Sequence, residues 1–178
     1  MLRGIGKNPW MRFLTIVRHC EATSGTDDYA RTLTATGRTQ AEWLRQSALS
    51  SEGLGQFGPT TCLVSAAART RETYALAFAG TPFVRSLQPS ELIYNGHRHV
   101  TGLDLLAPLA EIDPVTESLS VIAHNPSVLE LVHELSDVVR DEFIDNFPVG
   151  AAYVLEIPTD RTIGRGRYRV VATLCPPS

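Results

Sequence analysis

The sequence is nearly without lysine and has few cysteines. Of its 16 basic residues, Lys7 is the one lysine and the rest are arginines. An arginine by itself is therefore weak evidence for a phosphate site, and only its position along the chain can indicate one. The three cysteines, Cys20, Cys62 and Cys175, are odd in number and widely spaced. They fit neither a disulfide framework nor a C-x-x-C metal site. This usage predicts a reducing, cytoplasmic location.

Long hydrophobic runs and an excess of positive charge are also lacking. No stretch approaches the length of apolar sequence that a membrane-spanning helix needs. Residues 1–13 include basic residues but no apolar segment typical of a secretory signal. The formal net charge is -3, whereas proteins that bind nucleic acid are usually basic. We therefore expect no membrane segment and no nucleic-acid partner.

What remains is the composition of an ordinary globular protein. The chain has 178 residues, of which 43% are hydrophobic and 20% charged. This length and composition predict one folded domain with a substantial core. We expect residues 1–10 to form a flexible N-terminal arm and residues 11–178 to form the single domain.

Three short apolar runs predict strands that are buried on both faces, as in a parallel sheet. They lie at 13–17, 61–64 and 119–123. Helical patterns separate or follow them at 34–47, 69–79 and 128–135. Thr34 is the expected cap of the first helix, and Asn125 with Pro126 the expected start of the last.

The C-terminal part of the chain has a different pattern. Two strand-like runs, 151–157 and 167–174, flank a turn-rich link, which predicts an antiparallel hairpin at a sheet edge. The alternation of strands and helices before it predicts a three-layer α/β sandwich. Its central sheet is expected to be mostly parallel, with helices on both faces and antiparallel strands at the C-terminal edge.

Residues with chemical function follow the predicted strands. In an open parallel sheet, ligands bind beyond the carboxyl ends of the strands. Three strand ends carry such residues: Arg18 and His19 after the first, Ser65 and Arg69 after the second, and His124 and Asn125 after the third. Two histidines and two arginines are therefore expected at one edge of the sheet.

This combination favours a phosphoryl group as the ligand. Guanidinium groups pair with phosphate oxygens, and a helix N-terminus adds N–H donors. An imidazole nitrogen can serve as the nucleophile when the ring is neutral. Nearby arginines are expected to keep His19 neutral by lowering its pKa. One histidine after a strand is more often structural, but two histidines and two arginines at three strand ends indicate a phosphate site.

Four motifs, in the same order along the chain, resemble those of the histidine phosphatase superfamily, which has the phosphoglycerate mutase-like fold. They are Arg18-His19 for R-H-G, Arg31-Thr32-Leu33-Thr34-x-x-Gly37-x-x-Gln40-Ala41 for R-P-L-T-x-x-G-x-x-Q-A, Ser65-Ala66-x-x-Arg69-Thr70-x-Glu72-Thr73 for S-P/A-x-x-R-x-x-Q/E-T, and Val121-Ile122-Ala123-His124-Asn125-Pro126 for V-x-H-N/x-P. Glu21-Ala22 resembles the compact SixA-type branch, the phosphohistidine phosphatases.

The resemblance implies a role for each matching residue. His19 is the implied nucleophile that becomes phosphorylated. Arg18 and Arg69 hold the phosphoryl oxygens, and His124 contacts the same group and balances its charge. Asn125 lines the pocket. The resemblance implies no metal and no other cofactor.

Some positions depart from the family pattern or fit it in two ways. Cys20 replaces the glycine of R-H-G, which predicts either a crowded pocket or a changed backbone, and its thiol among arginines is expected to ionise and oxidise. Glu91 is a candidate general acid, although Leu92-x-Tyr94 matches the compact branch better. Arg31 either reaches the edge of the phosphate or is structural.

The identity of the substrate stays open between three possibilities. A phosphorylated protein carrying phosphohistidine is favoured, because its imidazole leaves readily, whereas an alkyl phosphate needs a proton donor. The alternatives are a small phosphorylated metabolite and a non-catalytic phosphate-binding module. The pair His97 and His99 suggests a solvated loop rather than a metal site.

Overall fold

The structure is a computed structural model that describes residues 10–96, 98–113, 115, 117–136 and 146–177. Most of the expected N-terminal arm, residues 1–9, lies outside them, as does His97. The elements in chain order are β1 (Met11–Arg18), α1 (Ala35–Leu49), the 3₁₀ helix η1 (Leu54–Phe57), β2 (Thr60–Ser65), α2 (Ala68–Ala77), β3 (Val84–Ser90), α3 (Gly102–Glu111), β4 (Ser118–Ala123), α4 (Ser127–Leu135), β5 (Ala152–Pro158) and β6 (Arg169–Leu174).

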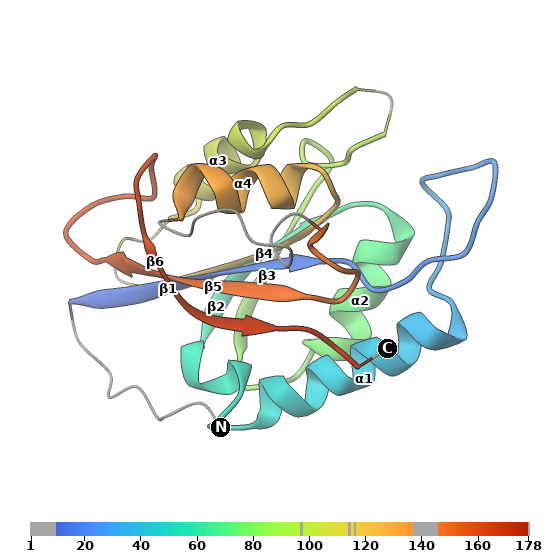
Figure 1. The fold of residues 1–178 in the computed structure, drawn as a ribbon, viewed down its shortest axis with the longest axis horizontal. Helices are drawn as coiled ribbons and strands as arrows, with labels where there is room; N and C mark the ends of the chain where they lie inside the picture. Colours follow the sequence, from blue (N-terminus) through green and yellow to red (C-terminus); the bar gives the residue numbers. More distant parts are fainter. Residues whose placement is uncertain (1–9, 97, 114, 116, 137–145, 178) are drawn as a thin grey trace.

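The strands form one six-stranded sheet between two layers of helices. Its order is β3-β2-β4-β1-β5-β6, and the first four strands are mutually parallel. β5 and β6 are antiparallel at the C-terminal edge. Figure 1 shows α3 and α4 on one face of the sheet and α1 and α2 on the other. The predicted three-layer α/β class is therefore confirmed.

The central strands are buried on both faces, which explains their continuous apolar sequence. In β1, Leu14 and Ile16 pack in the core cluster that contains the side chains of α3 and α4. Val17 packs in the second cluster, with residues of α1 and η1. Because neighbouring side chains of a strand point to opposite faces, a two-sided core requires apolar residues at both.

One strand and one α-helix were not predicted from the sequence. β3 is an edge strand in which residues 85–89 are exposed, so it lacks an apolar run, and an edge position tolerates Pro89. Helix α3 starts with Gly102 and contains Pro108, both poor helix formers. Its start is fixed by a capping box between Thr101 and Asp104.

Two local predictions need correction. The stretch 49–59 was expected to be a surface loop, but it contains η1, whose Leu54 and Phe57 are buried in the core. The predicted cap of the last helix was one residue early, because α4 begins at Ser127 and Pro126 is its cap. Asn125 is therefore not the cap residue, and its buried Oδ1 has no hydrogen-bond partner among the described residues.

Candidate functional site

The sheet topology brings the two histidines together. β1 and β4 are parallel neighbours, with Arg18 opposite Ala123, so each is followed by a histidine at the same level. The backbone N–H of His19 donates to the carbonyl of Ala123 at 3.1 Å. The rings of His19 and His124 have centroids 5.1 Å apart. These two strand ends therefore lie side by side, as the sequence predicted.

One ring nitrogen of His19 is hydrogen-bonded to the backbone, and the other faces the side chain of Arg69. Its Nδ1 lies 2.7 Å from the carbonyl oxygen of Cys20, which makes Nδ1 the protonated nitrogen. Its Nε2 accepts a hydrogen bond from Nε of Arg69 at 3.3 Å. Burial, and to a lesser degree the charges of Arg69 and Arg18, lowers the pKa of His19 to about 4. The direction agrees with the sequence-based expectation, but burial is a larger cause than the arginines.

His124 is held through the opposite nitrogen. Its Nε2 lies 2.8 Å from Oγ of Ser65, the last residue of β2. Its Nδ1 is buried and has no hydrogen-bond partner among the described residues. Burial is the main cause that lowers the pKa of His124 to about 2, with a contribution from His19. The ring is therefore neutral, and Nδ1 is the nitrogen that remains for a ligand.

Both histidines line a cavity of about 360 Å³. Its walls are Arg18, His19, Glu21, Ala22, Asp28, Arg31, Arg69, Asn95, His124, Asn125 and Val149. The structure thus brings six of the seven sequence-predicted site residues together. The seventh, Glu91, is not in this lining, and it accepts a hydrogen bond from the hydroxyl of Tyr29 at 2.8 Å instead.

Three guanidinium groups make this cavity suitable for an anion. Arg18 ends β1 and donates from Nη1 to the carbonyl of Phe147 at 2.9 Å, while its buried Nε has no partner among the described residues. Burial lowers the pKa of Arg18, but an arginine stays charged at neutral pH. Arg69 lies in the first turn of α2 and is 3% exposed. Arg31 donates from Nη1 to the carbonyl of Thr23 at 3.0 Å.

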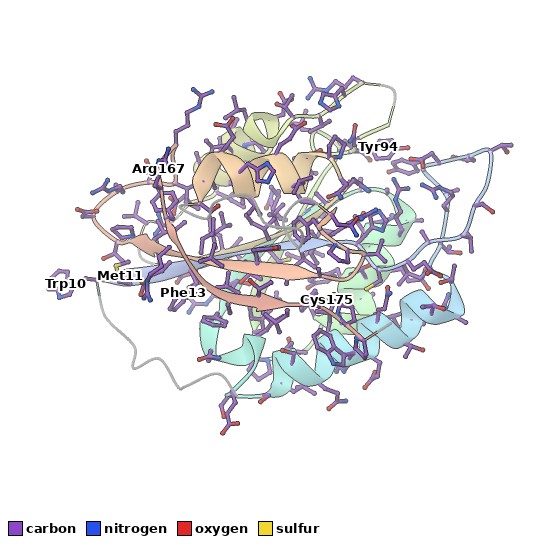
Figure 2. All side chains as sticks on the ribbon, in the orientation of Figure 1. Trp10, Met11, Phe13, Tyr94, Arg167 and Cys175 are labelled. Atoms are coloured by element: carbon purple, nitrogen blue, oxygen red, sulfur yellow. The ribbon has the colours of Figure 1, made fainter. Side chains whose placement is uncertain are left out.

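Sequence analysis missed a carboxylate in the same cavity. Asp28 accepts hydrogen bonds from Nε of Arg31 at 3.0 Å, from Nη2 of Arg69 at 3.1 Å and from the hydroxyl of Tyr94 at 2.9 Å. Partial burial opposes ionisation, but the bonds from Tyr94 and Arg31 and the charge of Arg69 outweigh it and lower the pKa of Asp28 to about 2. The spacing Asp28-x-x-Arg31 was the available signal. Figure 2 labels Tyr94, whose side chain lies beside the loop that follows β1.

Cys20 faces away from the cavity. Its side chain is 0% exposed and belongs to the core cluster between the sheet and α1. Its backbone N–H donates to Oγ1 of Thr73 at 3.0 Å. Burial raises the pKa of the Cys20 thiol to about 12, so the expectation of a reactive thiolate is wrong. The cysteine that replaces the motif glycine does not line the cavity.

The second motif supports the loop that carries His19. Thr34 caps α1 and donates from Oγ1 to Glu21 at 2.6 Å. Oε1 of Gln40 accepts from the backbone N–H of Glu21 at 2.9 Å. A Cβ at Gly37 would lie 2.0 Å from the carbonyl oxygen of Glu21, so only glycine fits there. Thr34, Gly37 and Gln40 therefore position the site without lining it, whereas Arg31 of the same motif lines the cavity.

Neither a metal cluster nor a membrane helix is found in the described part of the chain. No three His, Cys, Asp or Glu side chains there form a group able to hold a metal ion. None of the described helices is long and apolar enough to cross a membrane. His99, from the H-x-H pair, is exposed and lies 3.5 Å from Glu130.

No family model and no curated protein sequence matches the chain, but solved structures do. The candidate phosphohistidine phosphatase SixA of Nakamurella multipartitia superposes with a TM-score of 0.75 at 21% identity, covering 94% of this chain and 98% of the other. SixA of Agrobacterium tumefaciens, also a candidate, gives 0.69 at 23%, covering 93% and 98%. The protein histidine phosphatase SixA complexed with tungstate gives 0.67 at 20%, covering 92% and 97%. The chain therefore has the histidine phosphatase fold that its four motifs predicted.

Proposed function

We propose that this chain is a phosphatase that works through a covalent phosphohistidine on His19, and that its substrate is phosphohistidine in a protein. The observation that carries the proposal is the unprotonated Nε2 of His19, which accepts a hydrogen bond from Nε of Arg69 in an arginine-lined cavity. The likeness to a structure complexed with tungstate supports it, because tungstate is a tetrahedral oxyanion like phosphate.

In the first step, the Nε2 lone pair of His19 attacks the phosphorus atom while the bond from phosphorus to the leaving nitrogen breaks. The Nδ1 proton stays hydrogen-bonded to the Cys20 carbonyl, which stabilises the positive charge that forms on the ring. Arg18 and Arg69 hold the equatorial oxygens. His124 takes the tautomer in which Nε2 accepts from the Ser65 hydroxyl, and it donates from Nδ1 to one of these oxygens. In the second step, water attacks phosphorus, which releases inorganic phosphate and returns the lone pair to Nε2.

The carboxylates near the cavity favour a substrate with a good leaving group. Asp28 has a pKa of about 2, so it is ionised at neutral pH and has no proton to give. The Glu21 carboxylate accepts a hydrogen bond from the hydroxyl of Thr34, and Glu91 is outside the cavity lining. An alkoxide leaving group needs a proton donor, whereas the imidazole of phosphohistidine leaves once its other nitrogen carries a proton from solvent. The N–P bond is therefore the favoured substrate bond.

The proposal includes a reducing, cytoplasmic location. All three cysteines are free, and Cys20 and Cys62 are buried. Burial raises the pKa of the Cys62 thiol to about 12, as it does for Cys20. These two cysteines therefore pack as apolar core residues.

The experiment is to incubate the protein with a ³²P-phosphohistidine protein and quench in alkaline detergent, where phosphohistidine is stable. We expect an acid-labile label on the enzyme, released phosphate, and neither in His19→Ala. A panel of sugar, nucleotide and aryl phosphates tests the substrate class. Faster turnover of the sugar phosphates would indicate a metabolite phosphatase, and phosphate binding without label or turnover would indicate a binding module. Full activity of His19→Ala would refute the proposal.

A further inference from the structure

The cavity that would bind a phosphoryl group already contains an anion of its own. Asp28 lines it together with Arg18, Arg31 and Arg69. Its carboxylate oxygens accept from two of these arginines, at 3.0 Å from Nε of Arg31 and 3.1 Å from Nη2 of Arg69. A carboxylate so placed both competes for the donors that a phosphoryl oxygen needs and repels the negative charge of the ligand.

The loop that carries Asp28 has contacts that do not involve the carboxylate. The backbone of the loop has its own contacts, since the carbonyl of Asp28 accepts from Nη1 of Arg69 at 2.6 Å and the carbonyl of Tyr29 accepts from the N–H of Ala68 at 2.9 Å. A further backbone bond joins Thr23 to Thr32 across the loop at 2.9 Å. The Asp28 side chain is 44% exposed, so it fills no core space. Its position in the cavity therefore calls for another reason.

We propose that Asp28 is an internal counter-anion that weakens the hold of the cavity on inorganic phosphate and so favours product release. This inference rests on the proposed function. Three arginines around one cavity bind a dianion strongly, and strong binding of the product slows turnover. As phosphate leaves, the Asp28 carboxylate takes back Arg69 and Arg31, so the two guanidiniums are never left unpaired.

Tyr94 supports this arrangement from a distant part of the sequence. Its hydroxyl donates to Oδ2 of Asp28 at 2.9 Å, on the same oxygen that accepts from Arg69. The ring of Tyr94 also packs edge-on near His124, with centroids 5.9 Å apart. The carboxylate is thus anchored at the rim of the cavity and does not swing freely into it.

The test measures binding of inorganic phosphate by titration calorimetry at fixed ionic strength, without any turnover. Asp28→Asn keeps the size and an acceptor oxygen and removes the charge. We expect its Kd for phosphate to be roughly tenfold lower than that of the wild-type protein, because one charge near the dianion has been removed. A purely structural role predicts the opposite sign, since disordered arginines bind phosphate more weakly.

The matched control is Asp27→Asn. It makes the same change in net charge at the neighbouring, exposed residue, which is not in the cavity lining and accepts from the backbone N–H of Tyr29 at 3.1 Å. We expect less than a twofold change in its Kd. An unchanged or raised Kd in Asp28→Asn would overturn the inference. The proposed function would still stand in that case if the wild-type protein binds phosphate. If neither wild type nor Asp28→Asn binds phosphate, both fail.

Discussion

The turns that follow β1 and β4 each place a histidine at the same level of the sheet. The two histidines are hydrogen-bonded to the protein through opposite ring nitrogens. Both histidines are neutral, because burial lowers their pKa values to about 4 for His19 and about 2 for His124. His19 donates from Nδ1 to the backbone, and its unprotonated Nε2, the proposed attacking atom, accepts from Arg69. His124 is bonded through Nε2 and keeps Nδ1. The ring nitrogen that the protein occupies decides whether a histidine is a nucleophile or a donor.

The hydrogen bonds that hold the two rings also differ in the sequence separation of their partners. His19 is held by the carbonyl of the next residue, Cys20, so its orientation depends on the backbone of one turn. His124 is held by Ser65, which comes from a neighbouring strand and depends on the β2–β4 register. The ring of His19, the proposed nucleophile, is therefore fixed locally, and the ring of His124 is fixed by the fold. We expect mutations of the two partners to have different effects.

The largest expected effect separates the two rings directly. His19→Ala removes the attacking atom, and we expect turnover to fall by roughly 10³-fold or more, with no phosphoenzyme. At His124, asparagine places its amide near the position of Nδ1, whereas glutamine places it near Nε2. His124→Asn should therefore keep a donor to the phosphoryl group and retain more activity than His124→Gln, which we expect to lose roughly 10²-fold.

The measurement is kcat/KM on a phosphohistidine protein, together with alkaline-quench labelling. Both His124 variants should still form the labelled enzyme, only more slowly. His99→Ala, at an exposed histidine outside the cavity lining, is the matched control and should retain full activity. Equal activity of the Asn and Gln variants would contradict the assignment of Nδ1 as the donor.

The sequence was sufficient to place the residues of the proposed site at one edge of the sheet but not to assign a role to each ring nitrogen. Arg18, His19 and His124 were predictable because continuous apolar runs mark buried parallel strands, whose carboxyl ends must meet at one edge. Which ring nitrogen is free depends on bonds to Cys20 and Ser65 that no spacing specifies.

The elements and contacts that were missed leave no periodic apolar pattern in the sequence. β3 is exposed along most of its length, and so it lacks the apolar pattern by which strands are recognised. The bond between Asp28 and Tyr94 joins two irregular segments whose paths follow no periodicity. The Cys20 thiol was expected to be reactive because of arginine-rich surroundings, but its side chain lies in the core, where burial raises its pKa.

A smaller effect is expected at the serine that orients His124. Ser65→Ala removes the hydroxyl that bonds to Nε2 and leaves the nearby backbone intact, since the Ser65 carbonyl still accepts from Thr70 at 2.7 Å. In the proposed tautomer this hydroxyl donates to Nε2 and keeps the proton on Nδ1, so its removal no longer favours that form. We expect kcat to fall roughly tenfold with little change in KM. Nitrogen-15 shifts of His124 should show the proton on Nδ1 in the wild-type protein and a mixture in Ser65→Ala; unchanged shifts would rule out this positioning role.

The remaining expected effect is on stability in mild acid. In the unfolded chain a histidine titrates near its ordinary pKa of 6.5, whereas folded His19 titrates near 4. The unfolded state therefore binds more protons between these values, and the free energy of unfolding falls as the pH drops from 6.5 toward 4. His19→Ala lacks this contribution, so between pH 7 and pH 5 it should lose about 2 kcal/mol less than the wild-type protein in urea titrations. His99→Ala should follow the wild type, and an equal loss in all three would mean that burial leaves the pKa of His19 near 6.5, so that the ring is largely charged at pH 5 and unfit to attack.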